Sequence, residues 1–237
     1  MELPIYVLNL DRRPDRMAVL GAKLEALNAS YTRWPALDAR VEDPQSTLNA
    51  FGDRGALMGD ACCTLSHYAI WRDVLTKGHA GAIILEDDAT ISATFKDWVA
   101  DRAHHTLRQL SLDVLKLEAW GGQGRNRTRP WGKPSPLPGV FSLKGRFVGS
   151  CAYAIDAKAA GRILDALPSP GCPVDHILFA PTPLGLRTAF AAPAPVLHDV
   201  ERWGSDIPRQ AGTPPRRREA VLARLSGAQR VPVRVAV

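Results

Sequence analysis

Cysteine is scarce in this sequence, and its spacing gives no sign of a disulfide framework. Four cysteines occur in 237 residues, none of them in a C-x-x-C pair, and the adjacent Cys62 and Cys63 cannot easily bridge each other. We therefore expect reduced thiols in a cytoplasmic protein. In that setting the N-x-S/T sequences at Asn28 and Asn126 are expected to be chance matches.

Long apolar runs are also missing. No window approaches the roughly 18 uninterrupted apolar residues that a membrane helix requires, so we expect a soluble or at most peripheral protein. The first residues, MELPIYVLNLDRR, place an acid at position 2, ahead of the apolar stretch. This is the wrong charge order for a secretory signal, and the stretch is expected to form a strand.

Acidic residues are in deficit, and aromatic residues make up only 7% of the chain. Thirty Lys and Arg against 24 Asp and Glu give a net charge of +6, which favours anionic partners such as nucleotides, nucleic acids or lipid headgroups. Basic residues gather in segments 125–133 and 216–218. Aromatics other than Trp131 are not interleaved with them, so we expect no nucleic acid partner, although a basic nucleic-acid-binding protein stays an alternative.

The pattern of apolar residues predicts strands that alternate with helices. Pro14 suits a first helical turn, and the short apolar run 82–85 is typical of a strand covered on both faces. We expect an α/β fold with three layers and a mainly parallel central sheet, in a domain of residues 1–207 followed by a basic tail, 208–237. The expected strands are 3–10, 31–36, 82–85, 113–120, 147–155 and 186–192; the expected helices are 14–27, 60–75 with Asp60 as its cap, a helix around 95–99, 156–167 and 174–180; and the expected irregular segments are 44–59 and 121–146.

Three adjacent acids follow the strand at 82–85, in the sequence AIILEDDAT. In an extended backbone, Glu86 and Asp88 point to one side and Asp87 to the other, so two carboxylates face one ion. Hard oxygen ligands of this kind suit Mg²⁺ or Mn²⁺. A solvated strand end or a helix cap is the alternative interpretation.

A second polar cluster lies in DACCTLSHYAIW. His67 and Trp71 share a helical face, which is typical of a histidine packed beside an aromatic ring. Cys63 and His67 also have the spacing of a nucleophile and its base, but no third residue that would orient them is evident.

Several motifs together carry a resemblance to a known family. YVLNLDRRPDR, CTLSHYAIW, AIILEDDA, GSCAYAIDAKAA and PVDHIL occur in the order seen in glycosyltransferase family 25. The sequence resembles that family over roughly residues 4–207. The family includes bacterial lipooligosaccharide β-galactosyltransferases and the galactosyltransferase domains that act on collagen. The resemblance implies a Rossmann-like GT-A fold and an inverting, metal-dependent transfer from a nucleotide sugar.

The resemblance also implies roles for particular residues. The donor would be bound by Asn9, Asp11, Arg16, Ser66, His67 and Asp87, and the cation by Glu86, Asp88 and His198. Arg16 would contact phosphate or hold Asp11, and Asp175 would be the catalytic base. As alternatives, Asp11 or Asp175 caps the helix that follows it, and His198 is a surface histidine. Cys62 stands where the family usually has glycine, which puts the local backbone shape in question.

The sequence therefore predicts a cytoplasmic hexosyltransferase. It would move a sugar, galactose first of all, from a UDP-sugar to a glycan or lipid-linked acceptor in lipopolysaccharide biosynthesis, with Mn²⁺ or Mg²⁺ as cofactor. The basic charge favours peripheral contact with an anionic membrane surface. A nucleotidyltransferase and a degenerate transferase that binds sugars without turnover are the rival hypotheses, although the first strand is not followed by a glycine-rich phosphate loop.

Overall fold

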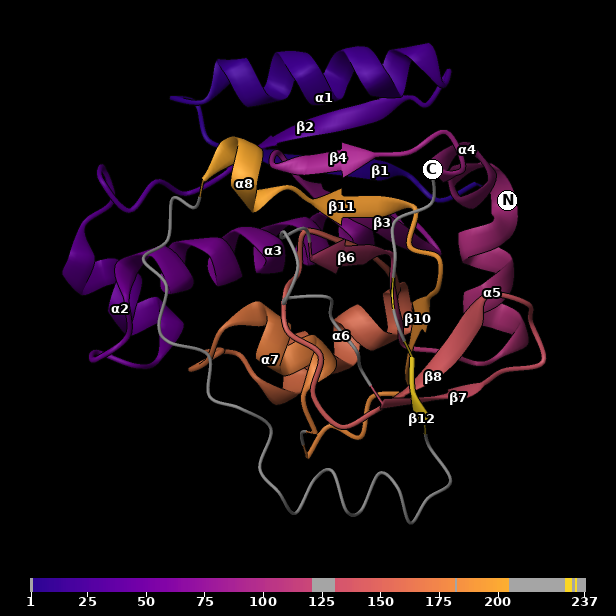
Figure 1. Cartoon of the computed structure of the whole chain (residues 1–237). Helices are drawn as coiled ribbons and strands as arrows, with labels where there is room; N and C mark the ends of the chain where they lie inside the picture. Colours follow the sequence, from indigo (N-terminus) through magenta and orange to yellow (C-terminus); the bar gives the residue numbers. More distant parts are fainter. Residues whose placement is uncertain (1, 121–130, 182, 205–228, 232, 234–237) are drawn as a thin grey trace.

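Strands and helices alternate along the chain and form three layers in the computed structural model, which describes residues 2–120, 131–181, 183–204, 229–231 and 233 (Figure 1). The helical segments are α1 (Pro14–Ala26), α2 (Pro44–Phe51), α3 (Met58–Thr76), α4 (Phe95–Asp97), a π-helical turn (Trp98–Arg102), α5 (Ala103–Gln109), α6 (Ala157–Ala166), α7 (Val174–Phe179) and α8 (Val200–Trp203). The strands are β1 (Ile5–Asn9), β2 (Tyr31–Pro35), β3 (Gly81–Glu86), β4 (Ala89–Ile91), β5 (Val114–Lys116), β6 (Glu118–Trp120), β7 (Trp131–Pro134), β8 (Val140–Lys144), β9 (Ala152–Asp156), β10 (Thr188–Ala191), β11 (Val196–His198) and β12 (Gln229–Arg230). The predicted α/β class is confirmed.

The described strands of the central sheet lie in the order β12-β7-β8-β10-β5-β9-β3-β1-β2. β1, β2, β3, β5, β7 and β10 run in one direction, and β8, β9 and β12 run in the other. The sheet is therefore mostly parallel, as predicted. The exception at its centre is β9, which is inserted antiparallel between β3 and β5.

Both faces of the central strands are buried. α3, α6 and α7 supply the core on one face, where Ile84 of β3 lies with Trp71 of α3. α1 and the helical segment 95–109 supply the core on the other face, where Ile83 lies with Leu20 of α1. Successive residues of β3 thus enter opposite layers, which explains why the predicted run 82–85 is apolar without alternation.

A second sheet of three strands, β4-β11-β6, lies beside the central one (Figure 1). The prediction of a single strand over residues 113–120 is wrong, because this segment divides into β5 in the central sheet and β6 in the small one. The division falls at Leu117, whose N–H donates to the Ala152 carbonyl at 3.0 Å while its own carbonyl accepts from Val196 N at 3.2 Å. The apolar pattern runs through this change of partners, so the sequence does not reveal it.

Four further predictions need correction. Segment 44–59 contains α2, which starts where the Asp43 side chain accepts from Ser46 N at 2.8 Å and ends at Gly52, in the left-handed region with φ 90°. α3 has Leu57 at its N-cap, so Asp60 lies inside the first turn and is not the cap. The strand predicted from residue 147 begins only at Ala152. The described part of segment 121–146 includes β7 and β8, which pair with each other, and β8 also pairs with β10. These contacts between strands leave no periodic signal in the sequence.

The C-terminal residues that are described lie against the central sheet. β12 pairs with β7, and Val231 and Val233 are buried in the core. Most of segment 208–237 lies outside the described residues, so its separation as a basic tail stays a prediction. The same holds for Arg125, Arg127 and Arg129 of the basic segment.

Candidate active site

The predicted site residues gather where β1 and β3 end. Asn9 is the last residue of β1, Glu86 is the last residue of β3, and Asp87 and Asp88 form a turn between β3 and β4. The turn is the point at which the chain passes from the central sheet to the small one. The carboxyl ends of strands in an open α/β sheet are the usual place for ligands.

Asp87 points into the protein and supports the site from inside. Its side chain accepts from Asn9 Nδ2 at 2.7 Å and from Arg16 Nη1 at 3.0 Å, and both side chains of this ion pair are buried. Burial raises the pKa of Asp87, while the Asn9 and Arg16 donors oppose that shift. Arg16 also donates to the Trp203 carbonyl at 2.9 Å and so ties α8 to α1. In this structure Arg16 holds Asp87 and not Asp11.

Asp11 lies at the surface, with 81% of its side chain exposed, and contacts Arg33. Arg33 Nε also donates to Asn9 Oδ1 at 2.8 Å. The residue at the N-cap of α1 is Arg13, without a side-chain cap, so Asp11 does not cap that helix. Asn9, Asp11 and Arg33 form the polar rim of a surface hollow of about 330 Å³ between α1 and β2.

Glu86 ends a buried chain of hydrogen bonds through α3 and β9. Trp71 Nε1 donates to Tyr153 Oη at 3.0 Å, Tyr153 Oη lies 2.8 Å from His67 Nδ1, and His67 Nε2 lies 3.3 Å from Glu86 Oε1. An indole nitrogen can only donate, so the Tyr153 hydroxyl accepts from Trp71 and its own proton is free for His67 Nδ1. The ionised carboxylate of Glu86 can only accept, so His67 donates its Nε2 proton to Glu86 and Nδ1 can accept the Tyr153 proton. The chain therefore fixes the tautomer of His67 and the orientation of the carboxylate.

Ser150 completes the environment of Glu86 by donating to the same Oε1 atom at 2.6 Å. Burial raises the pKa of Glu86, but the donors and the positive charge around it outweigh that effect and hold the pKa well below its usual range. Glu86 is thus an ionised carboxylate with 21% of its side chain exposed. His67 is buried, as the packed-histidine interpretation expects, yet it directly contacts the site.

Replacing Tyr153 by Phe tests this chain. The change removes the hydroxyl that joins Trp71 to His67, and we expect the free energy of unfolding to fall by about 1–3 kcal/mol because two buried polar groups lose their partner. Chemical denaturation measures this. Phe141→Leu, a change of aromatic packing away from Glu86, is the control for general loss of packing. A Tyr153→Phe variant as stable as the unchanged protein contradicts the assignment.

Ser66 has a structural place. Its hydroxyl donates to the Cys62 carbonyl at 2.7 Å and accepts from Leu37 N at 2.9 Å. These bonds join α3 to the segment after β2. Neither bond leads to the acids at the end of β3, so the role of Ser66 in donor binding stays a prediction.

Asp88 and His198 meet where β4 and β11 pair. His198 Nε2 lies 3.1 Å from Asp88 Oδ2, and β11 places His198 opposite Ala89. Burial lowers the pKa of His198, but the hydrogen bond and charge of Asp88, together with the charges of Glu118 and Glu86, outweigh that effect and raise it to about 9. His198 is therefore not a surface histidine in this structure. It lies inside an acidic cluster.

The residues present fit a divalent cation. Asp88 Oδ1 is buried and has no hydrogen-bond partner in the described part of the chain, and the imidazole of the adjacent His198 would offer nitrogen once the ion displaces its proton. Glu86, the third predicted ligand, is directed to His67 and Ser150. The described groups of three possible ligands within 4.8 Å of one another combine Glu86 with Cys63 and His67, and His198 with Glu118 and Cys151.

Asp175 lies in the first turn of α7. Its Oδ2 accepts from Gly149 N at 2.9 Å, whereas the N-cap of α7 is Pro173. Asp175 is therefore not the cap of this helix. Gly149 adopts φ 91°, in the left-handed region that favours glycine, which lets its N–H face α7.

Segment 149–151 brings the candidate residues together. Gly149 contacts Asp175, Ser150 contacts Glu86, and the Cys151 carbonyl accepts from Glu86 N at 2.8 Å. Neither this segment nor Tyr153 was predicted to contribute to the site, although GSCAY belongs to a motif of the resemblance.

Lys116 and Glu118 are the other residues that were missed. Both side chains are fully buried, and Lys116 Nζ donates to Glu118 Oε1 at 2.5 Å and to the Gly149 carbonyl. Burial raises the pKa of Glu118, while the charge of Lys116 opposes that shift. The signal was available in DVLKLEAW, because two opposite charges two residues apart interrupt an otherwise buried apolar strand.

Comparison with solved structures defines the class of fold. The chain is similar to the crystal structure of a protein named mannose-1-phosphate geranyltransferase, from Thermus thermophilus, with a TM-score of 0.51 and 14% sequence identity. The match covers 87% of this chain and 80% of that one. At this identity the likeness shows the fold alone. The fold is the Rossmann-type α/β architecture that the sequence predicts.

Comparison with families is more specific. The family described as "Glycosyltransferase family 25 (LPS biosynthesis protein)" matches residues 2–178, and the chain belongs to this family. The predicted resemblance is confirmed.

The curated relatives have different names. "Probable inactive glycosyltransferase 25 family member 3" of Bos taurus is 33% identical over 195 residues, which are 73% of this chain and 31% of the relative. "Procollagen galactosyltransferase 1-B" of Xenopus laevis is 25% identical over 190 residues, 73% of this chain and 30% of the relative. The chain thus spans about a third of the length of these relatives, and they include proteins named inactive as well as one named a galactosyltransferase.

Proposed function

We propose that the chain transfers a sugar from a UDP-sugar to a hydroxyl group of a glycan or lipid-linked acceptor. Galactose is the first candidate, since one relative is named a procollagen galactosyltransferase. The observation that carries the proposal is the arrangement around segment 149–151. Asp175 accepts a hydrogen bond from Gly149 and Glu86 accepts one from the next residue, Ser150, so the two acids are held by neighbouring donors of one short segment. An ionised acid at the end of β3 and a second acid nearby suit a reaction that needs one group for the donor and another for the acceptor.

In this proposal Asp88 and His198 hold the cation, Mn²⁺ or Mg²⁺, with Glu86 beside them. Such an ion, when bound, stabilises negative charge on the departing diphosphate. Other residues of the protein hold Asp88 and Glu86 in place. Arg16 and Asn9 fix Asp87 and with it the turn that carries Asp88, while His67 and Ser150 fix Glu86.

Asp175 is proposed as the base. Gly149 N–H binds Oδ2, and Oδ1, which lies 3.8 Å from His176 Nε2, would accept the proton of the acceptor hydroxyl as that oxygen attacks the anomeric carbon. The bond to the diphosphate breaks on the opposite side of that carbon, which inverts its configuration. Asn9 and Asp11, at the rim of the hollow beside β1, are proposed to contact the nucleotide.

The cellular setting is part of the proposal. We propose residues 1–207 as the transferase domain, lipopolysaccharide or a related glycan as the acceptor, and a cytoplasmic location with peripheral contact through the basic segments. The net charge of +6 supports contact with an anionic surface, and no nucleic acid partner is proposed. In the described part of the chain, none of the helices has the length and apolar character needed to cross a membrane.

The test measures UDP release from UDP-galactose with Mn²⁺, with Mg²⁺ and with EDTA. We expect release that EDTA abolishes and added Mn²⁺ restores. A panel of other nucleotide sugars, screened by thermal shift with Mn²⁺, identifies the donor because only a ligand of the native state raises the melting temperature. A shift without UDP release indicates a binding protein without turnover. The absence of both a thermal shift and UDP release with every donor would contradict the proposed function.

A further inference from the structure

Lys116, the last residue of β5, carries a charge into the interior of the protein. Its side chain is fully buried, and Nζ donates to Glu118 Oε1 at 2.5 Å and to the Gly149 carbonyl. We propose that Lys116 is a positioning residue for sugar transfer. It fixes segment 149–151, which contacts both acids of the proposed reaction. The inference rests on the proposed function and adds to it a residue that does not touch the substrate.

The ion pair with Glu118 does not by itself account for a lysine at this position. Moving two charges from water into the interior is costly, and well-packed apolar side chains in place of a buried ion pair are often as stable or more so. An ammonium group, however, has three N–H donors, so one carboxylate leaves donors for a second acceptor. An apolar residue at position 116 would leave the Gly149 carbonyl without this donor. The backbone contact is therefore what distinguishes lysine from an apolar residue here.

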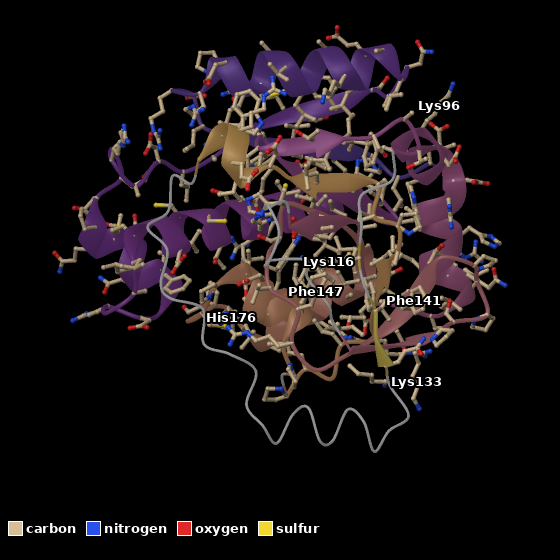
Figure 2. All side chains as sticks on the ribbon, in the orientation of Figure 1. Lys96, Lys116, Lys133, Phe141, Phe147 and His176 are labelled. Carbon is tan, nitrogen blue, oxygen red and sulfur yellow. The ribbon has the colours of Figure 1, made fainter. Side chains whose placement is uncertain are left out.

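Two aromatic rings hold the ammonium group in place. Figure 2 shows Lys116 in the middle of the molecule with Phe147 close by. Nζ lies 4.8 Å from the ring centroid of Phe147 and 4.4 Å from that of Phe179, distances at which a cation is attracted to the face of a ring. Phe179 is the last residue of α7, the helix that carries Asp175, and Phe147 N donates to the Phe179 carbonyl at 2.9 Å. Lys116 thus contacts α7 and the segment beside it at the same time.

The backbone at Gly149 carries this contact to both acids. Gly149 N–H donates to Asp175 Oδ2 at 2.9 Å, and Ser150 Oγ donates to Glu86 Oε1 at 2.6 Å. The carbonyl that Lys116 binds belongs to the peptide group that joins Gly149 to Ser150. Gly149 adopts φ 91°, and a glycine backbone rotates more freely than that of any other residue. A donor on this carbonyl therefore restricts the rotation that would move both hydrogen-bond donors away from the acids.

The loss of this donor is expected to lower kcat for transfer about 10–100-fold, because a displacement of about 1 Å near the reacting groups has an effect of that size. Lys116→Met alone leaves the buried Glu118 carboxylate without its partner and can unfold the chain. The informative variant is therefore Lys116→Met with Glu118→Gln, which removes both charges and closely keeps the shapes of the side chains. Leu115→Met, a volume-conserving change of the buried residue before Lys116, is the control and should keep kcat.

Hydrogen exchange measures the fixation of the segment without reference to turnover. We expect the amides of segment 149–151 to exchange at least about tenfold faster in the double variant, while β3 and β9 keep their protection. An ion pair that only stabilises the core predicts exchange that is unchanged, or that rises evenly over the sheet. Gly149→Ala strains the same backbone and gives a second readout. Combined with the double variant, it should lower kcat by less than the product of the two separate losses, because both changes act through one segment.

The outcomes separate this inference from the proposed function. A folded double variant with unchanged exchange in segment 149–151, or with unchanged kcat in an active enzyme, overturns the inference and leaves the function standing. A loss of kcat that saturating Mn²⁺ restores assigns the effect to the cation and also overturns it. Faster exchange confined to this segment, in a chain that releases no UDP from any donor, supports the role of Lys116 in fixing the segment and contradicts the proposed function instead.

Discussion

Replacing Asp175 by Asn is expected to lower kcat for sugar transfer about 10²–10⁴-fold, the range that removal of a general base produces. The substitution keeps the shape of the side chain, and the amide oxygen can still accept from Gly149 N, as Asp175 Oδ2 does at 2.9 Å. What is lost is the capacity to take the acceptor proton. Initial rates with UDP-galactose and a saccharide acceptor measure the effect, and the melting temperature should change little.

Asp165→Asn is the matched control for this prediction. Asp165 is an exposed acid of α6, so the same chemical change there should leave kcat and stability unaltered. A second readout separates the base from a residue that only binds the acceptor. Loss of the base lowers kcat, whereas loss of a binding contact raises KM. An Asp175→Asn enzyme that keeps most of its kcat shows that another residue takes the proton.

Replacing Arg16 by Met should lower the free energy of unfolding by about 3–5 kcal/mol, because it leaves the buried carboxylate of Asp87 without its charged partner. The Arg16–Asp87 pair is 3.0 Å long and joins α1 to the turn after β3. The change also removes the bond to Trp203 that holds α8. Denaturant unfolding measures the loss.

Arg13→Met provides the comparison. Arg13 forms an ion pair of similar length with Asp15, 2.9 Å, but the Asp15 side chain is 56% exposed. Surface pairs of this kind contribute about 0–1 kcal/mol, so the same substitution three residues earlier should change stability little. The double variant Arg16→Met with Asp87→Leu should recover much of the loss, since no buried charge is then left unpaired. Equal losses for Arg13→Met and Arg16→Met contradict the assigned role of Asp87.

The class of fold and the position of the site were predictable from local patterns. Residues 5–9 are apolar except for the last and β1 forms there, Pro14 begins α1, and the acids after the run 82–85 fall at a strand end. These features depend on residues within a dozen positions of one another, over which hydrophobic periodicity and the residues at helix ends are informative. The spaced motifs identified the family for the same reason, because each is a short continuous segment.

The partner of each polar side chain could not be predicted in this way. Glu86 and Asp88 were expected to face one ion together, but the turn after β3 directs Glu86 to His67 and Ser150, and Asp88 to His198. Lys116 and Glu118 were not recognised at all.

These contacts depend on which strands become neighbours. β9 enters the central sheet antiparallel between β3 and β5, and this brings segment 149–151 against the acids and against Lys116. Short segments of the chain specify their own helices, strands and charges through local backbone preferences. The chemistry of the site arises from contacts between residues as far apart in sequence as Asp88 and His198, and these form only when the two sheets assemble.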